Sequence, residues 1–162
     1  MNDGTKIPPV TSTLTPHLVC NGASAAIDFY RNAFGAVEQM RMPAQDGSGK
    51  LMHAMIRIGD ASVMLCDEFP EWGSVGPRTL NGTPVTLHLS VPDIDSAFQR
   101  ALDAGATTKM PVTDMFWGDR YGVLTDPFGH DWSMATHLRD VSVEEAIEAS
   151  KQQMCGDAAV EQ

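Results

Sequence analysis

The fold of this chain is decided by two stretches that repeat one pattern: AAIDFYRNAFGA at residues 25–36 and DIDSAFQRALDAGA at residues 93–106. In both, apolar residues recur at spacings of three and four, which predicts an amphipathic helix, and Gly-Ala closes the stretch. An alternating, strand-like run precedes each helix, and three more such runs follow it. A duplication within 162 residues predicts two βαβββ modules that share one fold rather than two independent domains.

The strand-like runs supply the remaining elements. We expect strands at about 13–20, 36–42, 50–58 and 61–66, and again at about 85–91, 108–113, 118–125 and 132–137. Ser24 is the expected N-cap of the first helix, and Gly35 is the residue expected to end it. The expected fold class is α+β, in which the two modules form one cupped, barrel-like mixed sheet with the helices outside.

The chain divides into three parts by composition. Residues 1–11 lack periodicity and are expected to form a flexible arm, and residues 12–140 are expected to form a single domain. Within that domain we expect module one at about 12–66, a linker at 67–84 and module two at about 85–138. Residues 141–162 are expected to form a helix and tail, because Ser142 and Glu145 have the spacing of a capping box.

Charge and cysteine content exclude several classes of partner. The net charge of −10 opposes binding to nucleic acid, whose affinity for proteins rests on Lys and Arg. No run of about 18 apolar residues and no signal-like N-terminus is present, so we expect neither a membrane span nor secretion. Cys20, Cys66 and Cys155 are odd in number and show no CxxC spacing, which favours a reducing, cytoplasmic location.

Alternation along the strands separates an apolar face from a polar one. In the run at 85–91, Thr86, His88 and Ser90 lie opposite Val and Leu residues, and in the first strand Thr15 and His17 share the polar face. Small, uncharged polar residues suit a cavity better than an open, solvated face. The candidate cavity residues on these faces are Thr15, His17, His53, Arg57, Met64, Cys66, Thr86, His88, Ser133 and His137.

Several motifs then point to a known family. FWGDRYG at 116–122, DPFGH at 126–130 with Trp132, and TPHLV at 15–19 resemble the PhnB-like branch of the vicinal oxygen chelate superfamily, which includes glyoxalase I, extradiol dioxygenases and bleomycin-resistance proteins. The resemblance covers about residues 12–140. It implies paired modules around a small-molecule cavity, usually in a homodimer.

The resemblance also implies a metal-ligand pattern, with one His or Glu from the first and last strand of each module. An ungapped placement puts Thr15, Met64, Thr86 and Ser133 at those positions, and none is a good ligand for a divalent metal at neutral pH. We therefore expect the standard centre to be absent.

Two histidines leave a displaced metal site open. His17 and His88 lie two residues further along equivalent strands, and with His53, Asp67, Glu68 or His137 they would suit Zn, Ni, Mn or Fe. The alternative is that both are polar cavity residues without a metal.

Trp117 and Arg120 belong to the aromatic, charged segment before the last strands. Arg120 would either hold an anionic ligand or brace Asp119 and Asp126 as an ion pair, and Arg57 is a second possible anion holder.

Three functions follow as alternatives. One is an enzyme of the glyoxalase-like class, a lyase, isomerase, transferase or oxygenase that acts on a small oxygenated or electrophilic substrate. Another is a non-catalytic protein of bleomycin-resistance type that sequesters a ligand by stacking it on Trp72 or Trp117. A structural or regulatory protein with an empty pocket is a third.

Overall fold

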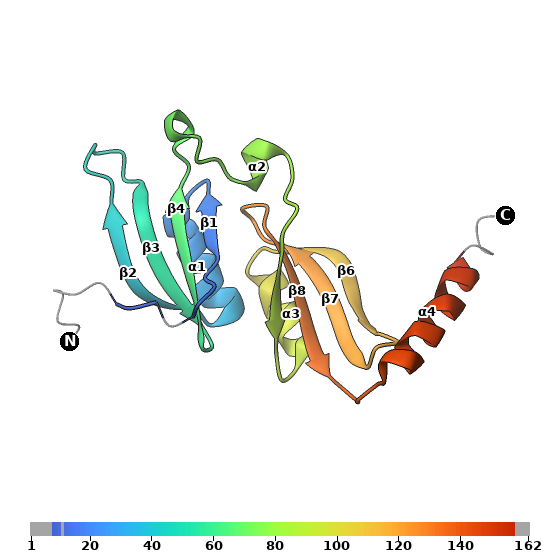
Figure 1. The fold of residues 1–162 in the computed structure, drawn as a ribbon. Helices are drawn as coiled ribbons and strands as arrows, with labels where there is room; N and C mark the ends of the chain where they lie inside the picture. The colour runs from blue at the N-terminus through green and yellow to red at the C-terminus, as the bar shows by residue number, and fades with distance from the viewer. Residues whose placement is uncertain (1–7, 11, 158–162) are drawn as a thin grey trace.

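A computed structural model describes residues 8–10 and 12–157 of the chain, with side chains as far as Lys151 (Figure 1). Residues 1–7 and 11 of the expected arm lie outside the described residues. The first module contains β1 (His17–Cys20), α1 (Ala23–Phe34), β2 (Val37–Pro43), β3 (Leu51–Ile58) and β4 (Ala61–Asp67). A connection with two short helices, η1 (Pro70–Trp72) and α2 (Pro77–Leu80), leads to the second module. That module contains β5 (Thr86–Ser90), α3 (Ile94–Asp103), β6 (Thr107–Asp114), β7 (Asp119–Thr125) and β8 (Asp131–His137), and α4 (Val143–Asp157) follows it.

The strands form two separate four-stranded sheets. Sheet 1 has the order β1-β4-β3-β2 and sheet 2 has the order β5-β8-β7-β6. In each sheet the first pair is parallel and the other pairs are antiparallel. The duplicated α+β fold is therefore confirmed. The single barrel-like sheet is wrong, because no ladder among the described residues joins the sheets and both β1 and β5 are edge strands.

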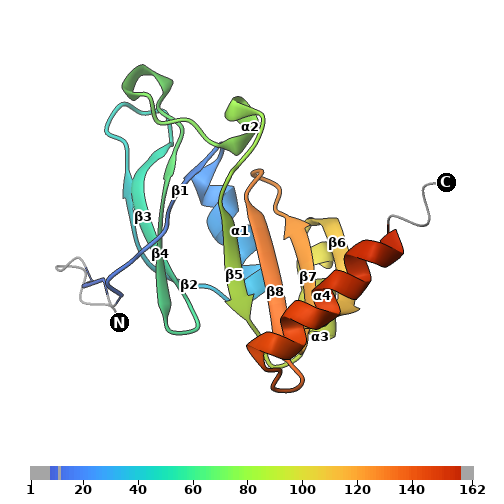
Figure 2. The ribbon, with the colours of Figure 1, turned by 45° about the vertical axis from the view of Figure 1, so that its right-hand side comes forward.

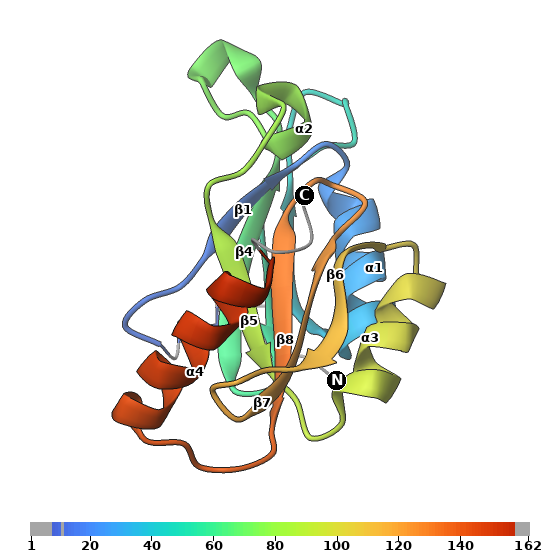
Figure 3. The ribbon, with the colours of Figure 1, turned by 90° about the vertical axis from the view of Figure 1, so that its right-hand side faces the viewer.

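One core holds the two modules together. Helix α1 packs against sheet 1 and against α3, and α3 packs against sheet 2. Figures 1 and 2 show α1 between the two sheets. The buried core is one continuous cluster that takes residues from both helices and from the helix-bearing face of each sheet. The helix-bearing faces are therefore turned toward each other. The opposite face of each sheet, here called its outer face, is turned away from this shared core. Figure 3 looks toward the outer face of sheet 2, with sheet 1 behind it.

Side chains from the last strand of each module cap the helix N-termini. In module one, Oδ1 of the buried Asp67 accepts hydrogen bonds from the backbone amides of Gly22 (3.0 Å) and Ala23 (2.9 Å). In module two, the Thr136 hydroxyl accepts from the amide of Ile94 at 2.8 Å. Ser24 was therefore the wrong residue for the N-cap of α1, because a distant carboxylate supplies the acceptor.

Two other predicted helix ends are confirmed. Gly35 follows α1 in the left-handed conformation, with φ 67°, and its amide bonds to the carbonyl oxygen of Arg31. Ser142 Oγ accepts from the amide of Glu145 at the start of α4. None of the described helices is long and apolar enough to span a membrane.

A buried carboxylate joins the two modules. Asp126, 2% exposed, lies in the turn before β8 and accepts four hydrogen bonds. Its Oδ1 accepts from the amides of Phe128 (2.8 Å) and His130 (3.0 Å). Its Oδ2 accepts from the Tyr30 hydroxyl of α1 (2.7 Å) and from Trp132 Nε1 (2.9 Å). Burial, followed by the Asp126 charge, raises the pKa of Tyr30 well above its ordinary value, so the phenol remains a donor.

The Asp126 network predicts a large effect of a nearly isosteric change. Asp126→Asn keeps the shape of the side chain but replaces one acceptor oxygen with an NH2 group, which would face two hydrogen-bond donors. We therefore expect the free energy of unfolding to fall by about 2–4 kcal/mol. Tyr30→Phe removes one donor and should cost about 1–2 kcal/mol. Urea denaturation measures both. Asp60→Asn, on the exposed β3–β4 turn, is the matched control and should stay within about 0.5 kcal/mol of wild type. Equal effects at Asp60 and Asp126 would contradict this account.

Candidate functional site

The outer face of sheet 2 carries a polar and aromatic cluster. A 2.8 Å hydrogen bond joins His88 Nδ1 on β5 to the buried hydroxyl of Ser133 on β8. The His88 ring stacks with Tyr121 of β7 at 6.3 Å between centroids, and Trp117 meets Tyr121 edge to face at 5.6 Å. These side chains come together because Tyr121, Val123 and Ser133 share a face in the β7–β8 register. The cluster offers ring surfaces beside one hydrogen-bonded imidazole.

The outer face of sheet 1 carries imidazole and sulfur side chains. His17 of β1 and His53 of β3 lie 5.6 Å apart between ring centroids, with their planes nearly perpendicular. His17 pairs with Met64 of β4, which pairs in turn with Met55 of β3. Burial, and then the nearby His53, lowers the pKa of His17 below its ordinary value. The lowered pKa favours the neutral form of His17, which lies beside the polarisable sulfur atoms of Met64 and Met55.

The strand register shows which residues lie opposite each other in the parallel strand pair of each sheet. His17 pairs directly with Met64, and His88 pairs directly with Ser133. His17 and His88 therefore lie beside Met64 and Ser133, two of the four positions in the ungapped placement. Thr15 precedes β1, where its hydroxyl bonds to Ser12, and Thr86 pairs with Asp131.

One chain does not assemble the expected metal ligands. His17 and His88 lie on outer faces that point away from each other. Glu68 is buried and accepts from the amide of Gly76 at 2.7 Å. Among the described residues, no group of three His, Cys, Asp or Glu side chains could hold a metal ion. The residues of a single chain therefore do not fit the divalent metal centre that the family resemblance implies.

Two of the remaining candidates have structural partners. Arg120 points to the helix-bearing side of sheet 2. There its guanidinium binds both carboxylate oxygens of Asp95 on α3 (2.8 and 2.9 Å) and Oδ1 of Asp114 (2.7 Å). Arg120 does brace the fold, but its acidic partners differ from the expected Asp119 and Asp126. Cys66 is buried, with its Sγ 3.9 Å from the Ser74 hydroxyl.

The other candidates lie at the margins of the outer faces. Arg57 is exposed and donates to the carbonyl oxygen of Gly59. His137 is exposed at the end of β8 between two carboxylates, with Nδ1 2.9 Å from Asp119 and Nε2 3.1 Å from Asp140. Arg57 and His137 therefore lie near the strand ends of the outer faces rather than at their centres.

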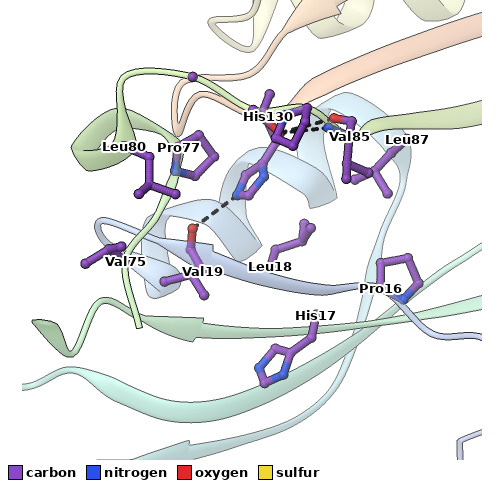
Figure 4. A pocket seen from close by; sticks show the side chains of 13 residues that line it. Pro16, His17, Leu18, Val19, Val75, Pro77, Leu80, Val85, Leu87 and His130 are labelled. Carbon is purple, nitrogen blue, oxygen red and sulfur yellow. Dashed lines mark hydrogen bonds between the residues drawn. The ribbon is translucent and has the colours of Figure 1, made fainter. Parts of the chain in front are cut away.

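A pocket of about 350 Å³ lies between β1 and the connection that carries α2 (Figure 4). Its apolar walls include Val75, Pro77 and Leu80, and the buried His130 donates from Nε2 to the carbonyl oxygen of Val19 at 3.2 Å. A neighbouring pocket of about 430 Å³ shares Val85 with it and reaches His88. Together they form a groove between the edges of β1 and β5. Periodicity does not predict this groove, because the connection at 67–84 has none, although its Val, Pro and Leu residues are a visible signal.

Comparisons with known proteins agree with this architecture. The Glyoxalase/Bleomycin resistance protein/Dioxygenase superfamily profile matches residues 7–134. This chain belongs to that superfamily. The Mycobacterium tuberculosis protein Rv0887c is 50% identical over 147 residues, which is 89% of this chain and 85% of the relative.

Solved structures of other proteins show the same fold. TioX from Micromonospora sp. ML1 is 28% identical and superposes with a TM-score of 0.61. The match covers 78% of this chain and 99% of the TioX chain. PhnB protein from Bacillus cereus has a TM-score of 0.62 over 77% of this chain and 99% of its own, and at 19% identity it supports the fold alone.

The two carboxylates on either side of His137 predict that stability depends on pH. The hydrogen bond to Asp119, and then the one to Asp140, raises the pKa of His137 above its ordinary value. Its contribution to stability is therefore fully present below about pH 6.5 and is lost as the pH rises through the folded-state pKa. We expect NMR titration of the imidazole to show the raised pKa, and Asp119→Asn to bring it back toward the ordinary value. An unchanged pKa of His137 in Asp119→Asn would contradict this explanation. Asp103→Asn, which changes an exposed carboxylate on α3, is the control and should leave the pKa of His137 unchanged.

Proposed function

We propose that this protein binds an apolar, ring-containing small molecule between the outer face of sheet 1 in one chain and the outer face of sheet 2 in a second copy. The observation that carries the proposal is that both outer faces present thioether, aromatic and aliphatic side chains at their centres and yet point away from each other within one chain. A homodimer and a ligand of this class are thus parts of one proposal.

The linings favour a ligand rather than bulk water. A solvated outer face of an antiparallel sheet normally carries long charged residues. Here the central positions are Met55 and Met64 in sheet 1 and Tyr121, Val123 and Ser133 in sheet 2. In sheet 2 the charged groups stand at the strand ends, where Lys109 pairs with Asp131 and His137 with Asp119.

The edges of the sheets favour a second copy. Strands β1 and β5 are edge strands, and exposed edges invite pairing or cover. Two large apolar residues beside them are strongly exposed, Leu14 at 87% and Val85 at 61%. A twofold partner that turned its sheet 2 toward sheet 1 would cover both edges and enclose both outer faces.

The stacked rings favour a planar ligand. Trp117, Tyr121 and His88 form a continuous ring cluster, and offset or edge-to-face contacts with a further ring contribute about 0.5–1.5 kcal/mol each beyond buried area. Trp72, the other stacking residue considered, is 67% exposed and already stacks on Phe69. We therefore assign ligand stacking to Trp117 and Tyr121.

An enzyme of the glyoxalase-like class is the second candidate. His17 and His88 occupy equivalent positions in the two modules, so the proposed dimer would set two imidazoles on opposite walls of one cavity. Imidazoles are the commonest general acid–base groups. Turnover of a small oxygenated substrate, lost in His17→Ala and in His88→Ala, would establish this candidate.

The free Cys20 and Cys66 thiols support the further proposal of a cytoplasmic location.

The neutral fluorophore N-phenyl-1-naphthylamine tests the binding proposal, because the net charge of −10 does not repel it. We expect saturable binding of about one probe per chain, and an affinity about tenfold lower in Trp117→Ala or Tyr121→Ala, as loss of a stacking ring costs about 1 kcal/mol or more. Trp72→Ala is the matched control and should change the affinity less than about twofold. Equal losses from Trp72→Ala and Trp117→Ala, or no saturable binding, would contradict the proposal.

A further inference from the structure

Sulfur side chains gather on the outer face of sheet 1 together with two imidazoles. We call this set the methionine–histidine face; it consists of Met40, Met42, Met55, Met64, His17 and His53. Register pairs link His17 to Met64, Met64 to Met55 and Met55 to Met40 across four strands. Although no helix covers this face, Met55 is only 2% exposed. Neighbouring side chains must therefore close over it.

The second module shows that the fold does not require these residues. With His17 aligned to His88, the strand registers align Met64 with Ser133 and Met55 with Val123. By the same registers His53 corresponds to Tyr121 and Met42 to Thr113, and only Met40 has a methionine counterpart, Met110. The same backbone therefore packs well with few sulfur atoms, so packing alone does not explain their concentration in sheet 1.

The donor types select one class of cation. Thioether sulfur is a soft ligand that prefers Cu(I), and imidazole binds copper well, whereas Mg²⁺, Ca²⁺ and Mn²⁺ prefer carboxylates. The strand residues described on this outer face include no Asp or Glu. A hard divalent ion would therefore find no suitable oxygen ligands here.

The spacing of the imidazoles suits a shared ion. Two rings that bind one ion through bonds of about 2.0 Å have centroids about 5–6 Å apart, depending on the angle at the ion. The His17 and His53 centroids are 5.6 Å apart. Met64 lies beside His17 on the neighbouring strand, one inter-strand spacing of about 4.8 Å away, so its flexible side chain can reach the same point.

We propose that His17, His53 and Met64 bind one Cu(I) ion on the outer face of sheet 1. The three donors belong to one sheet of one chain and need no organic ligand, so the site goes beyond the proposed function. Met55, next to Met64 in the register, is the available fourth ligand.

Competition for Cu(I) with bathocuproine disulfonate under anaerobic conditions tests the site. The protein is the full chain with Cys66→Ser and Cys155→Ser, because thiols bind Cu(I) themselves; Cys20 is kept because its side chain is fully buried. We expect it to withdraw about one Cu(I) per chain, with an affinity about tenfold lower, or more, in His53→Gln and in Met64→Leu. Titration with Ag(I), a redox-inert substitute, should shift the ε-methyl NMR signal of Met64.

Met52→Leu is the matched control, because Met52 precedes His53 on the same strand but points to the opposite side of sheet 1. It should leave the Cu(I) affinity within about twofold of the parent protein. Urea denaturation of each variant separates loss of the site from loss of folding. Absence of competition, equal effects of Met52→Leu and Met64→Leu, or equally tight binding of Zn(II) would each overturn the proposal. Because N-phenyl-1-naphthylamine binding is measured without metal, failure of either proposal leaves the other open to test.

Discussion

The carboxylate of Asp126 is the constraint on which the arrangement of the two modules depends. It is buried and accepts four hydrogen bonds, so the loss of any one donor would leave a buried oxygen without a partner. One donor, Tyr30, belongs to the first module, while the turn amides and Trp132 belong to the second. The ring of Trp132 also packs against Phe34 of α1 at 4.7 Å between centroids. This network holds the helix-bearing faces together around α1 and α3.

The position of the core determines where chemistry can occur. Since the helix-bearing faces share one interior, both outer faces are left uncovered by α1 and α3, and their central residues are neutral, aromatic or sulfur-containing. The two faces are also unequal: sheet 2 presents stacked rings and a His–Ser hydrogen bond, while sheet 1 presents imidazoles and thioethers. An aromatic ligand and a soft cation therefore suit different walls of the same molecule.

Local patterns in the sequence predict the elements well but not how they are assembled. The three-and-four spacing at 25–36 and the alternation at 85–91 are local properties, so both helices and the duplicated strands could be predicted. The direction in which each outer face points depends on contacts such as Tyr30 with Asp126, 96 residues apart, and no period reveals these. For the same reason the acidic partners of Arg120 and the cap of α1 by Asp67 were missed. The histidines were found by alternation, but their pairing with Met64 and Ser133 required the register.

Complementation between chains tests most directly the claim that one chain cannot form the cavity alone. Met64→Ala alters only the wall from sheet 1, and Tyr121→Ala alters only the wall from sheet 2, so each homodimer should bind N-phenyl-1-naphthylamine weakly. When equal amounts of the two variants are reassembled at random, about half of the dimers are mixed. Each mixed dimer has two cavities, of which one carries both substitutions and the other carries neither. About a quarter of all cavities should therefore recover wild-type affinity. If no tight sites reappear on mixing, although mixed dimers are shown to form, the cavity lies within a single chain and the account is contradicted.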